Sequence, residues 1–192
     1  MKVSDMIKIV SILSLVWVLA ACTAPGPQSI DLSPSYEFAK LDGVKIPIEL
    51  VIVDEREDTN IIGYRRARND APISLNVSLA STLGQSIQEA MQQQGIVMSK
   101  GPEPLTQVKV IVNEFRYWSP NEDWVSEVNL NATVTVEIKR GKTSLEKKFS
   151  AEKKQEVATA PNAKYNQKLA DELLVNLIES IFSNNEIVNF LK

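Results

Sequence analysis

The clearest pattern in the chain is an alternation of apolar and polar residues between positions 124 and 139, which is strict from Glu127 onwards. Seven apolar residues share one parity: Trp124, Val128, Leu130, Ala132, Val134, Val136 and Ile138. This alternation predicts a strand with one face on a core and one in water, as in antiparallel sheets. Arg140-Gly141-Lys142 predicts a turn into a further strand over about 143–156, whose many lysines suit a sheet edge.

Three earlier segments also show strand patterns. Residues 46–53 are apolar on both faces in their second half, as in a buried strand, and residues 61–64 form a candidate short strand. Val108, Val110 and Val112 share one parity, which changes at Phe115 and Tyr117. The change predicts a bulge near residues 113–114.

Two amphipathic helices are expected. Over about 75–94 an apolar residue recurs at every fourth position, with Ser74 as N-cap and Gly95 just past the end. Over about 163–182 a second apolar stripe predicts another helix, and residues 186–191 could add a final short turn. Together these elements predict an α+β fold, a two-layer sandwich in which an antiparallel sheet of about four to five strands carries two helices on one face. Residues 36–192 would form this single domain.

The first residues have the features of an export signal. Lys2 and Lys8 precede an apolar run from Ile9 to Ala21. At roughly 13 residues this run fits a signal peptide and is too short to span a bilayer. It ends in Leu19-Ala20-Ala21-Cys22, which resembles a lipobox, so residues 1–21 are expected to be removed and Cys22 to be lipidated.

Residues 22–35 are rich in proline and serine, which predicts a flexible tether that reaches at most about 45 Å. By resemblance to the usual sorting rule, Thr23 after the cysteine favours the outer membrane over the inner one. The expected location is therefore the periplasmic face of the outer membrane, with the membrane itself as a partner through the lipid anchor.

Composition then removes several classes of function. The chain has no histidine and one cysteine, the predicted lipidation site, which excludes histidine-based catalysis, His-ligated metal sites and an intrachain disulfide. We therefore expect no catalytic residue, metal or cofactor. The net charge is −3, and about −4 after removal of the signal, which argues against nucleic acid as the main partner.

Charged residues crowd the loop that follows the first strand: Asp54, Arg56, Asp58, Arg65, Arg66 and Arg68. Arginine forks could recognise a carboxylate or phosphate ligand. The alternative is a solvated loop whose opposite charges pair with each other, and the pattern favours this alternative.

A second candidate is aromatic. Tyr117, Trp118 and Trp124 bracket the expected tip of a hairpin, where they could dock a protein or stack on a sugar. Alternatively, Trp124 and Tyr117 cap the core, while the parity of Trp118 points it away from Tyr117. The carboxylate pairs Asp54/Asp58 and Glu122/Asp123 could be imagined as glycosidase acid and base, yet nothing in the sequence indicates the burial this chemistry needs.

Several features together resemble the YajG-like family of small bacterial lipoproteins. They are the lipobox, Ser33-Pro34-Ser35, Asp54-Glu55-Arg56-Glu57-Asp58, the helix ending in Met91-Gln92-Gln93-Gln94-Gly95, the long alternating strand, and the terminal helix closing on Phe190-Leu191. This family has no assigned biochemical activity, so the resemblance supplies no catalytic residues.

The expected function is that of a non-enzymatic envelope binding or assembly protein, anchored in the outer membrane, with an envelope protein as its partner. Two alternatives stay open: an accessory lipoprotein subunit of an envelope transport system, and, less favoured, a cell-wall glycan enzyme.

Overall fold

The computed structural model describes residues 26–39, 47–65, 71–96, 106–120 and 127–191. Its strands are β1 (Gln28–Ile30), β2 (Ile48–Asp54), β3 (Ile61–Tyr64), β4 (Pro72–Leu75), β5 (Thr106–Trp118), β6 (Glu127–Arg140) and β7 (Thr143–Glu156). Its helices are α2 (Leu79–Gln93), α3 (Ala163–Phe182) and α4 (Asn185–Phe190).

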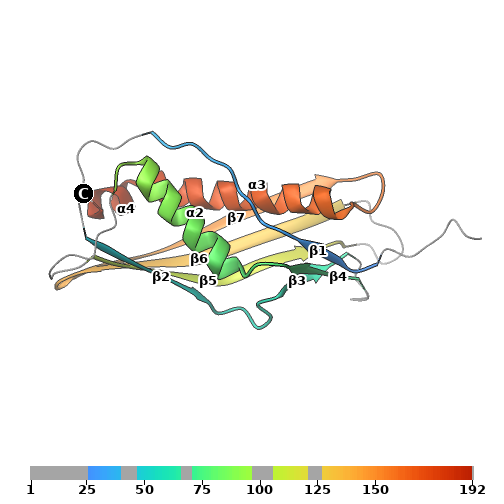
Figure 1. Cartoon of the computed structure of the whole chain (residues 1–192), viewed down its shortest axis with the longest axis horizontal. Helices are drawn as coiled ribbons and strands as arrows, with labels where there is room; N and C mark the ends of the chain where they lie inside the picture. Colours follow the sequence, from blue (N-terminus) through green and yellow to red (C-terminus); the bar gives the residue numbers. More distant parts are fainter. Residues whose placement is uncertain (1–25, 40–46, 66–70, 97–105, 121–126, 192) are drawn as a thin grey trace, which may run out of the picture.

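The seven strands form one open, mixed sheet in the order β1-β4-β3-β5-β6-β7, with β2 paired to β5 (Figure 1). The pairs β5·β6 and β6·β7 are antiparallel, whereas β1·β4, β2·β5 and β3·β5 are parallel. The α+β class is therefore confirmed, but an antiparallel sheet of four to five strands is wrong. The missed strands are short ones, which carry too few residues to show a periodicity.

Helix α2 is the reason that β2 and β5 can run in parallel. Parallel neighbours need a long crossover connection, and the chain between Asp54 and Thr106 supplies it through α2. Strand β2 pairs only with β5 along this part of the sheet, and Val51 is 43% exposed. The expectation that this strand is buried on both faces is therefore wrong.

The antiparallel half follows the sequence pattern closely. All six apolar residues of one parity in β6, from Val128 to Ile138, are buried, and the register of β5 against β6 shifts between Val112 and Glu114, as the expected bulge requires. Gly141 turns the chain with a φ of +60°. Thr133 is a correction: it was expected to face water, but it is buried and its hydroxyl bonds to that of Ser150 at 3.1 Å.

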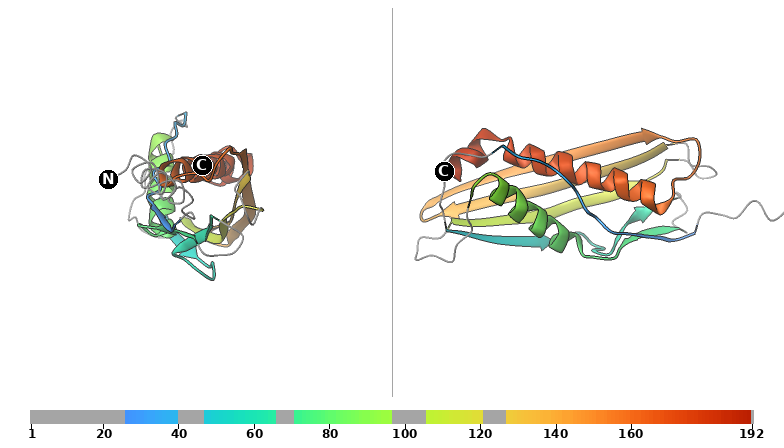
Figure 2. Two further views of the ribbon diagram at one scale, coloured as in Figure 1. Left: turned by 90° about the vertical axis from the view of Figure 1, so that its right-hand side faces the viewer. Right: turned by 45° about the horizontal axis from the view of Figure 1, so that its top comes forward.

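The three helices of the described residues lie on one face of the sheet, as the end-on view in Figure 2 shows. Helix α3 has the predicted bounds and buries its stripe of leucines and isoleucines. Helix α2 begins later than predicted, because Ser78 caps it and Leu75 belongs to β4. Gly95 follows its end at a φ of +82°, where glycine is favoured.

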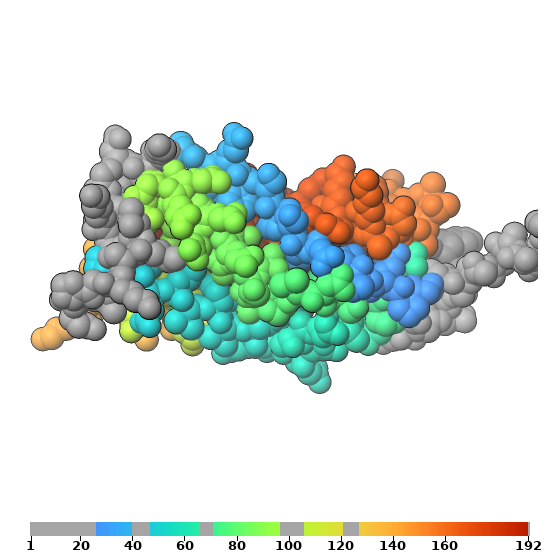
Figure 3. All heavy atoms as spheres, viewed as in Figure 1, coloured from blue at the N-terminus to red at the C-terminus, as the bar shows by residue number. Residues whose placement is uncertain are grey.

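The N-terminal segment is part of the fold. We call residues 26–39 the strap: it begins with β1 and then crosses between α2 and α3 (Figure 3). Ile30 and Tyr36 are buried, and the Phe38 ring lies 5.4 Å from that of Phe182. The expectation of a flexible tether up to residue 35 is therefore wrong for residues 26–35, because strand pairing and apolar contacts hold this segment against the domain.

Candidate functional site

Asp54 and Arg56 form a buried ion pair at the end of β2. Arg56 donates from Nε to Asp54 Oδ1 at 2.9 Å and from Nη2 to Asp54 Oδ2 at 2.7 Å. The side chains of Arg56 and Asp54 are only 6% and 9% exposed. Arg56 also donates to the carbonyl oxygen of Thr59 at 2.8 Å. The Arg56 guanidinium therefore binds groups within the protein. For Asp54 and Arg56, the alternative in which opposite charges of the loop pair with each other is the one that the structure shows.

Asp58 organises the turn into β3. Its Oδ1 accepts the backbone N–H groups of Asn60 and Ile61, both at 2.9 Å. These two hydrogen bonds, Ile61 first, lower the pKa of the exposed Asp58 carboxyl. The Asp58 side chain therefore stabilises the turn, while the Asp54 carboxylate is held by Arg56.

Arg65 leaves the loop and enters the protein. It is buried, and it donates to the carbonyl oxygens of Gly26 at 2.9 Å and Pro161 at 2.8 Å. Burial lowers the pKa of its guanidinium. Arg65 is therefore a structural clamp between the strap and the start of α3. Arg66, Arg68 and Trp124 lie outside the described residues.

A buried polar cluster surrounds this clamp. Asn166 donates from Nδ2 to Gln28 Oε1 at 2.7 Å, and Gln28 donates from Nε2 to the Pro161 carbonyl at 3.1 Å. The Tyr117 hydroxyl is buried nearby and makes no hydrogen bond to a described residue. Its burial raises the Tyr117 pKa far above the usual 10.0, only partly offset by the positive charge of Arg65. Sequence reasoning placed Tyr117 on the core side but missed this cluster, because Gln28 and Asn166 give no local signal.

Trp118 lies on the opposite side of β5 from Tyr117. Its side chain is half-buried, and the Arg116 guanidinium carbon lies 5.4 Å from its ring centroid, at cation–π distance. Trp118 stands opposite Asn129 on β6, on the sheet face that no described helix covers. The parity prediction for Trp118 is therefore confirmed.

The two candidate groups meet in one hollow, which we call the face groove. It has a volume of about 1140 Å³ and is lined by residues 56–59, 61–64 and 113–120. Gly63 joins its walls, since it pairs with Tyr117 across β3 and β5. A Cβ at Gly63 would lie 1.8 Å from the Tyr117 carbonyl oxygen. The charged loop and the aromatic strand end are thus held together by a contact that only glycine allows.

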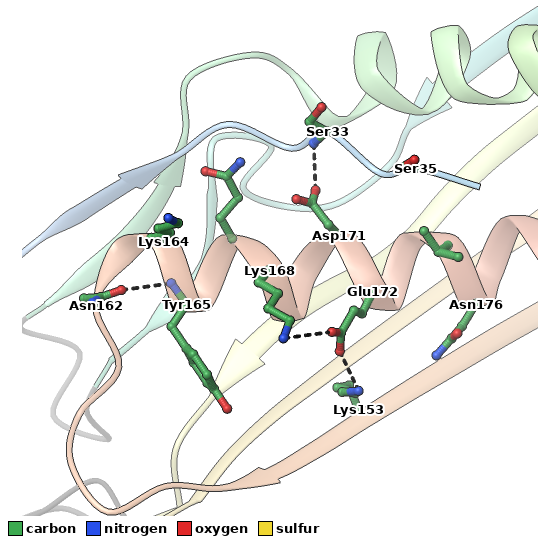
Figure 4. A pocket seen from close by; sticks show the side chains of 12 residues that line it. Ser33, Ser35, Lys153, Asn162, Lys164, Tyr165, Lys168, Asp171, Glu172 and Asn176 are labelled. Carbon is green, nitrogen blue, oxygen red and sulfur yellow. Dashed lines mark hydrogen bonds and ion pairs between the residues drawn. The ribbon is translucent and has the colours of Figure 1, made fainter. Parts of the chain in front are cut away.

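A second hollow, the helix groove, runs along the outer side of α3 (Figure 4). Its charged groups largely bond within the protein: Lys153 pairs with Glu172 at 2.6 Å, and Asp171 Oδ1 accepts the Ser33 N–H at 2.7 Å. Burial raises the pKa of Asp171, and the Ser33 hydrogen bond opposes that rise. The helix groove therefore serves as a seat for the strap, and the face groove is the better candidate site.

Comparisons with known proteins identify the family. Residues 39–192 match a family described as "Uncharacterized lipoprotein". No curated protein matches the chain. Among the described residues, no helix has both the length and the apolar character needed to cross a bilayer.

Similar solved structures include the rare lipoprotein B of Shewanella oneidensis, with 11% identity, a TM-score of 0.48, and coverage of 73% of this chain and 96% of that one. A minor lipoprotein of Acinetobacter baumannii has 17% identity, a TM-score of 0.43, and coverage of 74% and 90%. On the strength of the match over residues 39–192, the chain belongs to this family of lipoproteins.

Proposed function

We propose that this lipoprotein is a non-enzymatic binding or assembly protein of the cell envelope, and that it holds a partner protein in the face groove. Cys22 carries the lipid, and Thr23 favours delivery to the periplasmic face of the outer membrane. We also propose that the chain is a YajG-like lipoprotein.

The observation that carries the proposal is Trp118. A half-buried tryptophan with an arginine over its ring is the kind of side chain that dominates protein interfaces. It stands on an uncovered sheet face beside a hollow that Gly63 holds in shape. The carboxylate of Asp54 is engaged by Arg56 and that of Asp58 by backbone N–H groups, which favours binding over acid–base chemistry by these two residues.

Site-specific photocrosslinking tests the proposal. A photoreactive amino acid at Arg116 should capture a partner in intact cells, whereas the same group at Lys148, exposed on the same sheet face but outside the groove, should not. Mass spectrometry would identify the captured protein. Equal capture at both positions, or none at either, would contradict the role of the face groove.

A matched pair of variants separates binding from folding. Trp118→Ala should cost about 2 kcal/mol of stability, since the side chain is partly exposed, and should reduce capture at Arg116 by more than this loss of stability explains. Tyr165→Ala removes an aromatic that is 37% exposed outside the groove and should leave capture unchanged. If both variants reduce capture in proportion to their loss of stability, the groove is only structural.

A further inference from the structure

The strap is fixed to the domain almost from its first described residue. Arg65 Nη1 donates to the Gly26 carbonyl at 2.9 Å, and β1 pairs with β4 over Gln28, Ser29 and Ile30. Two hydrogen bonds to the Pro161 carbonyl, from Arg65 and Gln28, tie the same end to the start of α3. The chain is therefore anchored in the folded body at Gly26.

This anchoring leaves very little free chain. Only three residues, Thr23, Ala24 and Pro25, lie between Cys22 and Gly26, so a fully extended chain reaches at most about 14 Å from Cys22 to Gly26. A 14-residue strand such as β7 is about 46 Å long. A lipid on Cys22 can therefore hold only one end of the domain near the bilayer, and the other end must project away from it or lie flat beside it.

Figures 1 and 2 show which end this is. The exit of the strap, the end of β5, the end of β7 and the start of α3 lie together, while the β6–β7 turn and the C-terminus lie at the far end. The near end carries Trp118 and Tyr165, both partly exposed, and Lys164 beside Tyr165. Aromatic and basic side chains of this kind are enriched at membrane interfaces.

The geometry points to a defined orientation: the strap holds the near end, with Trp118, against the phospholipid surface, and the β6–β7 turn points away from it. This inference rests on lipidation of Cys22 and therefore on the proposed function. It adds that the face groove, whose lining includes Trp118 and Pro120 at the end of β5, opens next to the membrane. A partner protein would then enter the groove at the bilayer surface.

Tryptophan fluorescence in proteoliposomes tests this orientation. The chain has three tryptophans, and cleavage before Cys22 removes Trp17. In the lipidated Trp124→Phe protein, Trp118 is the only reporter. A distal probe is made by Lys142→Trp in the Trp118→Phe/Trp124→Phe background. Brominated phosphatidylcholine should quench Trp118 several-fold more than the distal probe, and equal quenching would overturn the orientation.

A longer tether tests the cause. Inserting about 20 glycine and serine residues after Thr23 would add about 25 Å of reach and should abolish the difference in quenching. A difference that persists would show that the strap does not set the orientation. Flotation with the vesicles separates the premises: a protein that does not float refutes the lipid anchor, and with it this inference. A floating protein with equal quenching refutes the orientation alone, while crosslinking at Arg116 still judges the face groove.

Discussion

The ion pair between Asp54 and Arg56 can be tested by a double-mutant cycle. Asp54→Leu leaves the guanidinium of Arg56 buried with only backbone carbonyls as partners, and Arg56→Met leaves the carboxylate of Asp54 buried without its two charge-assisted hydrogen bonds. Removing one member of a buried pair costs about 3–5 kcal/mol, because the other charge stays desolvated. Each single variant should therefore lose about that much stability.

The double variant Asp54→Leu/Arg56→Met should be far less damaging than the sum of the two. With both charges gone, no uncompensated ion remains, and the new side chains can pack between β2 and the end of β5. We expect a coupling free energy of at least about 2 kcal/mol, favourable to the native pair.

Urea unfolding of the domain, followed by circular dichroism at neutral pH, measures all four free energies. Additive effects, with each single variant costing less than about 1 kcal/mol, would refute the reasoning. That result would mean that the pair is solvated, and it would return Arg56 to the set of residues available to an acidic ligand.

Four further predictions concern folding and anchoring. Gly63→Ala should lower the free energy of unfolding in urea by more than about 3 kcal/mol, because the new Cβ would clash with the Tyr117 backbone. In the control variant Gly141→Ala the Cβ has no atom within 4 Å, so only the positive φ should cost stability, about 1 kcal/mol. Val134→Asp buries a carboxylate without a partner and should cost several kcal/mol of stability, while Asn131→Asp on the opposite face of β6 should cost little. Similar melting temperatures for the two variants would show that the core-facing side of β6 is assigned wrongly. Burial keeps the Tyr117 pKa in the folded protein far above the unfolded value near 10.0, so the unfolded chain loses this proton first and the free energy of unfolding should fall as the pH rises through 10. Urea unfolding at pH 9 and pH 11 should show a smaller fall for Tyr117→Phe than for the unmodified protein. Cys22→Ser should abolish labelling by a palmitate analogue and leave a larger precursor, and equal labelling of both proteins would refute lipidation at this residue.

Long elements with a strong periodicity could be predicted from the sequence. Helix α3 has the expected bounds, and β6 buries the expected parity, because each repeats its pattern over at least 14 residues. The start of α2 was misplaced because Leu75 continues the helical spacing while it lies in β4. Strands of three or four residues, such as β1 and β4, are too short for any period to show.

The candidate site divides in the same way. The parity of β5 correctly separated buried Tyr117 from partly exposed Trp118. Nothing local distinguishes Arg65, which is buried, from a solvated loop arginine, because its partners Gly26 and Pro161 are 39 and 96 residues away. The face groove depends on the parallel pairing of Gly63 with Tyr117, and sequence periodicity does not reveal which strands are neighbours.

The strap also sets an order of events in folding. Gln28 bonds to Asn166, 138 residues further along the chain, so the N-terminal end of the strap has no complete seat until α3 has formed and docked. Contacts of such long sequence separation form late in folding. The described start of the strap is therefore among the last parts of the domain to be fixed, although it comes first in the chain. A chain truncated before α3 would lack Asn166, and Gln28 would lose this partner even though the strap itself is complete.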